Sequence, residues 1–249
     1  MTIAVAAPWP WEGLPGLMDT MREPRSAILI TDSRWSFLGS RREPEDVGKK
    51  LFQLGTNAGA IYSGHVESAE RGIGRVKRLL RSSRVTADRL PEIAERLRAA
   101  HRQVGYGQVL NVVIAFRDDD RARLVSLTSS EDFIPMPVEG IQVLADERTR
   151  EAFRQGLDSV VDQTFRQTLS VPFDHLTGVR WVVSAMDLFV MNPKFDRTVG
   201  GKLQCGVIDD RGVVRMGYAR SRKPTGPWEM RSAAASDLKS YFEPHGRLR

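Results

Sequence analysis

The chain has 249 residues, of which 41% are hydrophobic and 27% are charged, and its formal net charge is +6. This length fits one large domain or two small ones, with enough apolar residues for a buried core. The single cysteine, Cys205, excludes a disulfide framework and a cysteine-based zinc cluster. No apolar run approaches the roughly 20 residues of a membrane helix, and Pro8 interrupts the apolar N-terminal stretch before it reaches signal-peptide length. We therefore expect a cytoplasmic protein with no membrane partner.

The positive charge is concentrated in two segments. Residues 65–104 have a net charge of +5 and residues 221–249 a net charge of +3. Such clusters can bind nucleic acid. In the first segment, however, the basic residues recur with Ile73 and Val76 at helical spacing, and no aromatic residues lie among them to stack on bases. This pattern favours a solvated helix face, so we expect no nucleic-acid partner.

The first third of the chain is rich in strand patterns. Prolines and glycines predict an irregular loop over 8–25, and Gly55 lies in a turn. The apolar patterns predict strands at 2–7, 27–31, 50–54 and 58–63.

Helical and strand patterns then alternate in blocks. Apolar residues at helical spacing predict helices over 66–80 and 90–100, the second with Asp88 as its N-cap. Three consecutive aspartates at 118–120 lack the spacing of a calcium loop and read as a hairpin turn, so no metal is expected. The remaining patterns predict strands at 109–116, 122–127, 138–144, 203–208 and 213–218 and helices at 146–163 and 176–191.

Two adjacent helices between blocks of strands do not fit a βαβ crossover. They fit an α+β fold in which two antiparallel sheets pack face to face, with a helix pair on each outer side. We expect one domain over residues 1–220, with an inserted loop at about 8–26, followed by a basic C-terminal tail over 221–249.

The N-terminus suggests a specific chemistry. Thr2 follows Met1, and a small second residue permits removal of the methionine, which would expose a free N-terminal threonine. Its hydroxyl could act as a nucleophile and its own α-amine as the general base. An unperturbed α-amine titrates at about 7.7–8.0, close to working pH.

Further motifs accompany Thr2. Asp32-Ser33-Arg34 follows a strand, Lys50-Leu51-Phe52 opens another, and Gly64 precedes the first helix. A later block reads Asp196-Arg197-Thr198-Val199-Gly200-Gly201. Together these motifs resemble the proteasome β-subunit family and its bacterial two-component protease relatives. The resemblance covers roughly residues 2–7 and 27–220 and implies the family's four-layer αββα sandwich, the fold of N-terminal nucleophile hydrolases.

The resemblance also implies roles for individual residues. Thr2 would be the nucleophile, Lys50 would lower the local pKa, and Asp32 would hold Lys50. The N–H of Gly64 would form the oxyanion hole, and Asp196 would lie near the Thr2 amine. Lys49 is the alternative to Lys50, because the separation between Asp32 and Lys50 is slightly longer than is usual in the family. No cofactor is implied.

Two supporting serines of the family are replaced, one by Val199 and the other by Ala145 or Asp146. The resemblance implies a threonine peptidase that cleaves peptides or unfolded proteins inside a homo-oligomeric ring or double ring. It leaves the identity of any ATPase partner undetermined. Two alternatives remain open: a non-catalytic ring or assembly protein with the same fold, and an N-terminal nucleophile amidase acting on small amides.

Overall fold

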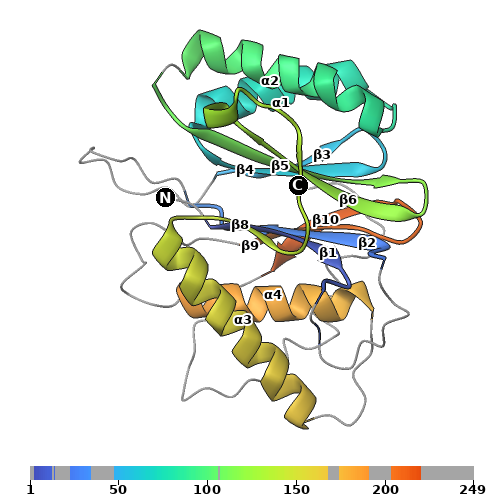
Figure 1. Cartoon of the computed structure of the whole chain (residues 1–249), viewed down its shortest axis with the longest axis vertical. Helices are drawn as coiled ribbons and strands as arrows, with labels where there is room; N and C mark the ends of the chain where they lie inside the picture. The colour runs from blue at the N-terminus through green and yellow to red at the C-terminus, as the bar shows by residue number, and fades with distance from the viewer. Residues whose placement is uncertain are drawn as a thin grey trace.

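Two antiparallel sheets stacked face to face form the centre of the molecule, and a pair of helices covers the outer side of each (Figure 1). The computed structural model describes residues 3–12, 14, 23–34, 48–105, 107–167, 174–190 and 203–219. The predicted α+β class and four-layer sandwich are confirmed.

The first sheet has the strand order β10-β9-β2-β1-β8. Its strands are β1 (Ala4–Trp9), β2 (Ser26–Thr31), β8 (Gln142–Leu144), β9 (Leu203–Ile208) and β10 (Val214–Ala219). β1 lies between β2 and β8, with Ala4 opposite Thr31 on one side and Leu144 on the other. Both edges of the start of β1 are therefore paired, which fixes the position of the chain just after Thr2.

The second sheet has the order β3-β4-β5-β6-β7. Its strands are β3 (Leu51–Leu54), β4 (Ala58–Gly64), β5 (Leu110–Asp118), β6 (Arg121–Thr128) and β7 (Met136–Pro137). β3–β4 and β5–β6 are hairpins with short turns, whereas the paired strands β4 and β5 are joined through the helices between residues 66 and 104.

Helices α1 (Val66–Leu80) and α2 (Leu90–Val104) cover the second sheet, and α3 (Glu147–Gln167) and α4 (His175–Val190) cover the first (Figure 1). Three buried apolar clusters correspond to the three interfaces between these four layers. Cys205 belongs to the cluster under α3 and α4, as expected of a small core residue. Alternate residues of each strand point to opposite faces, so each sheet contributes to two clusters.

Two local predictions were wrong. The segment predicted as one strand over 138–144 instead crosses between the sheets: β7 pairs with β6, and β8 pairs with β1. Pro137 ends the first piece and Gly140, with φ +75°, turns the chain. Asp88 is not the N-cap of α2, because it lies in a short 3₁₀ turn, Ala87–Arg89, and Arg89 occupies the cap position.

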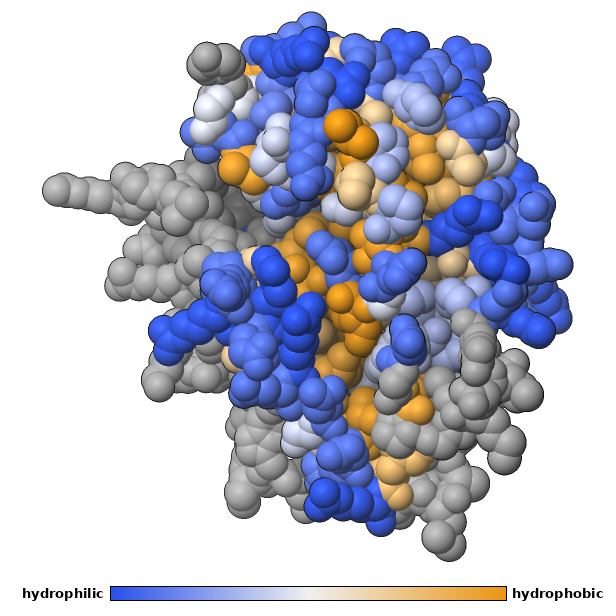
Figure 2. All heavy atoms as spheres, in the orientation of Figure 1, coloured by the Kyte–Doolittle hydropathy of each residue, from blue (hydrophilic) through white to orange (hydrophobic). Residues whose placement is uncertain are grey.

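In Figure 2 the side of the α1–α2 layer that faces the viewer is mostly hydrophilic, and a band of hydrophobic residues runs from the level of the two sheets down towards the α3–α4 layer. No helix in the part of the chain that the structure describes is long and apolar enough to cross a membrane. The proposed tail at 221–249 lies outside the described residues, as do residues 13 and 15–22 of the proposed insertion.

Candidate active site

A buried ion pair joins the residue that follows β2 to the residue that precedes β3. The ammonium nitrogen of Lys50 is 2.9 Å from a carboxylate oxygen of Asp32, and the two side chains are 1% and 0% exposed. Lys50 also donates a hydrogen bond to the backbone oxygen of Arg34. Removing two charges from water is costly, and a buried ion pair rarely repays that cost as stability alone. The pair is therefore a candidate for a chemical role.

The backbone explains why Asp32 lies here. It follows directly after β2, and its N–H donates to the carbonyl oxygen of Ile3 at 3.2 Å. The hydroxyl of Thr31 donates to the same carbonyl oxygen at 3.3 Å. Asp32 is thus tied to the residue that follows Thr2, and the ion pair lies beside the beginning of the chain.

Gln204 of β9 holds the backbone at Lys50. Its side-chain oxygen accepts hydrogen bonds from the N–H groups of Lys50 at 3.0 Å and Leu51 at 3.1 Å. Its amide nitrogen donates to the carbonyl oxygen of Gly48. Gln204 is 4% exposed. It connects the first sheet to the entry of β3, and it fixes the backbone from which the Lys50 side chain extends.

Lys49, the alternative to Lys50, has a different environment. It is exposed, and its ammonium lies 5.5 Å from the centre of the Phe52 ring. Partial burial and the nearby charge of Lys77 lower the pKa of Lys49. Of the two lysines, Lys50 is the one that pairs with Asp32.

Gly64 ends β4 with a backbone that favours glycine. Its φ is +102°, and a Cβ atom built there would lie 2.0 Å from the carbonyl oxygen of Val109. The next residue, His65, donates its N–H to that oxygen at 2.9 Å and caps α1. The turn at Gly64 is therefore held both by the strand pairing of β4 and by the start of the helix.

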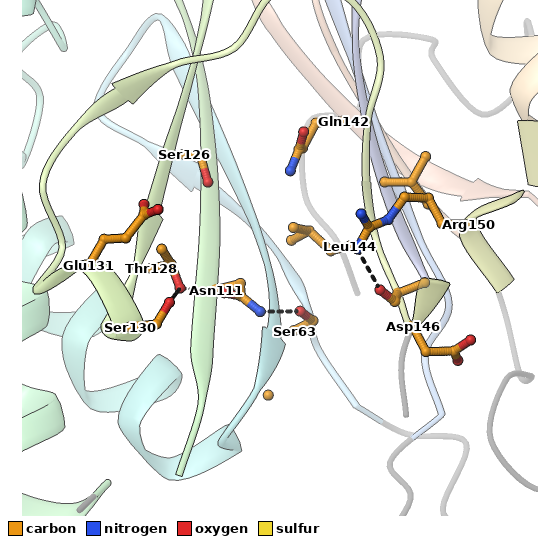
Figure 3. Close-up of a pocket in the computed structure, with 13 residues that line it drawn as sticks. Ser63, Asn111, Ser126, Thr128, Ser130, Glu131, Gln142, Leu144, Asp146 and Arg150 are labelled. Atoms are coloured by element: carbon orange, nitrogen blue, oxygen red, sulfur yellow. Dashed lines mark hydrogen bonds between the residues drawn. The ribbon is translucent and has the colours of Figure 1, made fainter. Parts of the chain in front are cut away.

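Gly64 lines a cavity of about 450 Å³ between the two sheets (Figure 3). One wall comes from the inner face of the second sheet and the other from β8 and the beginning of α3. Leu144, in the second wall, is also the β-sheet partner of Ala4. The cavity, Gly64 and the chain that follows Thr2 therefore meet at the same end of the sandwich.

Asp146 is, with Ala145, one of the two residues where the family resemblance led us to expect a serine. It accepts hydrogen bonds from the N–H and the hydroxyl of Thr149, both at 2.8 Å, as a side chain that caps α3 does. Burial by itself raises the pKa of Asp146, but the hydrogen bonds from Thr149 outweigh it, and the pKa lies below its ordinary value. Both carboxylate oxygens are engaged with Thr149 in the structure.

Two residues of the predicted site, Thr2 and Asp196, lie outside the described residues, and so does Val199. Among the residues that are described, Asp32 and Lys50 are in direct contact, and Gly64 lines the cavity. No group of three His, Cys, Asp or Glu side chains is placed to hold a metal ion in the described ranges.

Gln204 and the polar wall of the cavity were not predicted from the sequence. A signal for both exists in the strand patterns. Gln204 is the polar residue of an otherwise apolar strand, and it alternates with outer-face residues such as Cys205. In β5, Asn111 occupies the inner-face register of the apolar Val113 and Ala115. A polar residue at a buried register is a candidate functional residue.

No family model matches the sequence, and no curated protein matches it. Among solved structures, the chain is similar to a mutant of Anbu from Hyphomicrobium sp. strain MC1, with a TM-score of 0.58. The two are 13% identical, and the match covers 88% of each chain. The fold is the proteasome-like sandwich. At this identity the likeness concerns the fold, and the roles of individual residues stay predictions.

Proposed function

We propose that this protein is a threonine-type N-terminal nucleophile hydrolase that cleaves peptide bonds. The observation that carries the proposal is the buried Lys50–Asp32 pair, which lies beside the chain start and is tied to Ile3 through the backbone of Asp32. Consecutive Cα atoms are about 3.8 Å apart, so residue 2 lies within one peptide unit of Ile3 in any conformation. The charge of Lys50, which is costly to bury, is thus kept close to Ile3, the residue after the proposed nucleophile Thr2.

The reaction follows from the groups available there. After removal of Met1, the hydroxyl oxygen of Thr2 attacks the carbonyl carbon of the scissile peptide bond, and its proton passes to the α-amine of Thr2. The positive charge of Lys50 favours the neutral, basic form of that amine, and Asp32 orients Lys50. The N–H of Gly64 stabilises the oxyanion.

The protonated amine then gives its proton to the leaving nitrogen as the C–N bond breaks, which leaves an ester on Thr2. A water molecule, deprotonated by the same amine, hydrolyses the ester and restores the threonine. Asp196 supports the amine. No cofactor enters the reaction.

Assembly is part of the proposal. The proteasome-like fold suggests a homo-oligomeric ring, and an exposed band of hydrophobic residues suits a subunit contact (Figure 2). Peptides or unfolded proteins are the proposed substrates, because a closed ring excludes folded proteins. The basic surface of α1 and α2 then serves contacts within the assembly or with a protein partner.

One observation favours a second candidate, a non-catalytic ring protein. Ala145 or Asp146 replaces the serine expected from the family, and the Asp146 side chain accepts two hydrogen bonds from Thr149. In this candidate the fold and the ion pair persist without turnover.

Labelling at the N-terminus distinguishes the two candidates. Intact mass should show loss of Met1, and a threonine-directed electrophile should add once per chain. The Thr2→Ala variant, folded and assembled like the wild type, should not react. A retained Met1, or equal labelling of the wild type and Thr2→Ala, would contradict the peptidase proposal. An assembled, Met1-free ring that does not react would support the non-catalytic candidate.

A further inference from the structure

The inner face of the second sheet changes character along its strands. Over most of its length it is apolar and packs against the first sheet through residues such as Ile61, Val113 and Leu124. Towards the end where Gly64 lies, the same face becomes polar. The residues there that line the cavity are Ser63, Asn111, Ser126 and Thr128. Each lies two or four residues from an apolar inner-face residue of the same strand, so its side chain points to the same inner face.

Three of these residues form a row across the sheet. Asn111 is paired in register with Ser63 on one side and with Thr128 on the other. The Thr128 hydroxyl donates to the side-chain oxygen of Asn111 at 2.6 Å, and the Asn111 amide nitrogen donates to Ser63 at 3.5 Å. The row therefore holds Asn111 in a fixed orientation at the cavity wall (Figure 3).

The row retains hydrogen-bonding capacity. Asn111 has two amide protons and two oxygen lone pairs, and the row uses one of each. The side chains of Ser126 and Gln142, from opposite walls, have no hydrogen-bond partner among the residues that the structure describes. These two residues face each other across the cavity in Figure 3. Both walls thus offer neutral donors and acceptors.

Charge at the cavity is balanced and peripheral. Glu131 and Arg150 are exposed and lie on opposite sides (Figure 3), and Arg150 already donates to the backbone oxygen of Ala145 at 3.2 Å. Asp146 is engaged with Thr149. A charged substrate side chain, whether cationic or anionic, would therefore find no buried side chain of opposite charge among the residues described at this cavity. An apolar side chain would leave the donors and acceptors of the walls without water or partner, which is unfavourable.

We propose that this cavity is a specificity subsite for a neutral, hydrogen-bonding side chain of the substrate peptide, of which glutamine and asparagine are the best fits. A primary amide has two donors and two acceptor lone pairs, which match the remaining capacity of Asn111 and Gln142. The volume of about 450 Å³ is within the range of ligand sites. The inference rests on the proposed function, because it places the subsite next to the oxyanion position at Gly64.

The test compares peptides that differ only by a near-isosteric pair, glutamine against methionine, at each position around the scissile bond. Binding to the assembled Thr2→Ala protein is measured by fluorescence anisotropy, and cleavage by the wild type is measured in parallel. At one position the glutamine peptide should bind at least about tenfold more tightly, since a site built for hydrogen bonds rejects an analogue that lacks them. Equal binding of both peptides at every position would overturn the inference.

Two variants locate the preference. Gln142→Met and Asn111→Leu should each reduce the glutamine preference to less than about threefold, because the wall then lacks the amide partner. Gln155→Met is the matched control, because Gln155 lies at an exposed position of α3 where its amide donates to Glu151 at 3.0 Å, and this variant should retain the preference. Thermal unfolding shows whether Asn111→Leu is folded. If that variant is unfolded, Gln142→Met alone is used for the test. A preference that survives Gln142→Met would overturn the inference.

The two proposals fail in different ways. Labelling of Thr2 without a glutamine preference would refute the subsite and leave the peptidase intact. A glutamine preference in binding, without labelling or cleavage, would refute the peptidase and support the cavity as a peptide-binding site.

Discussion

The side-chain oxygen of Gln204 lies 3.0 Å from the backbone nitrogen of Lys50, although the two residues are 154 positions apart in the chain. This contact joins β9 of one sheet to the entry of β3 in the other. It places the backbone of Lys50 where its ammonium reaches Asp32. Gln204 is thus a positioning residue that acts through Lys50.

Replacing Gln204 by leucine should destabilise the fold and weaken the site together. The N–H groups of Lys50 and Leu51 would lose their acceptor in a buried position, at a cost of about 1–3 kcal/mol. Chemical denaturation measures this loss. If Gln204 positions Lys50, the rate of Thr2 labelling should also fall by more than tenfold. Gln53→Leu, at an exposed position of β3, should change neither quantity.

The ion pair allows stability and function to be separated. Lys50→Met removes the cation that pairs with the buried carboxylate of Asp32, which should cost about 3–5 kcal/mol in the free energy of unfolding. Adding Asp32→Leu removes that charge and should restore most of the stability, because an apolar pair can replace a buried ion pair.

Labelling of Thr2 should be absent from both variants, including the stable double variant. Lys49→Met, at the exposed neighbour, should label normally. A stable double variant that labels at the wild-type rate would show that the pair has a structural role only.

Gly64 should not tolerate alanine. Its φ of +102° is unfavourable for any residue with a Cβ, and that atom would meet the carbonyl oxygen of Val109. We expect Gly64→Ala to lose about 1–3 kcal/mol, measured by denaturant unfolding. Gly74→Ala is the control: it lies inside α1, a Cβ there would meet the end of the Arg78 side chain at an ordinary contact distance of 3.9 Å, and the change should stabilise the protein by about 0.5–1 kcal/mol.

Asp187 of α4 should make stability fall as the pH rises. One of its carboxylate oxygens is buried with no hydrogen-bond partner among the described residues, and burial raises its pKa to about 7. The unfolded chain releases the same proton at about pH 3.9. Between these values the folded state holds one more proton, so stability declines from about pH 4 to pH 7 and this contribution is constant above.

Asp187→Asn mimics the protonated form at every pH. It should therefore stabilise the protein by about 1–3 kcal/mol at pH 8 and leave it nearly unchanged at pH 4. Unfolding curves at the two pH values measure this difference. An equal effect at both would contradict the raised pKa.

His101 should act in the opposite direction. Burial, followed by the charge of His65, lowers the pKa of His101, so the folded state binds its proton less readily than the unfolded chain. The His101 contribution to stability is fully present above the unfolded value of about 6.5 and declines as the pH falls below it. His101→Gln should flatten the stability profile below pH 6.5, as measured by unfolding curves across that range. An unchanged slope in His101→Gln would contradict this assignment.

Much of the fold could be predicted because its signals are local. Apolar residues at helical spacing located α1 and α2, and the hairpin turns bounded β5, β6, β9 and β10. The failures had non-local causes. The segment around Pro137 and Gly140 has the composition of one strand, but its two halves pair with different sheets. A strand's partner depends on where the rest of the chain is packed.

The amino-acid sequence by itself determined the order of elements through local patterns, and the resemblance of its motifs to a known family indicated the candidate residues Asp32, Lys50 and Gly64. Only the tertiary structure decided that Lys50 and not Lys49 pairs with Asp32, and that Gln204 holds it. The tertiary structure also decided that Asn111 and Gln142 line opposite walls of one cavity. Hydrophobic periodicity is a local property of a few consecutive residues, whereas the pairing of buried polar groups depends on the register and packing of strands that are far apart in the chain.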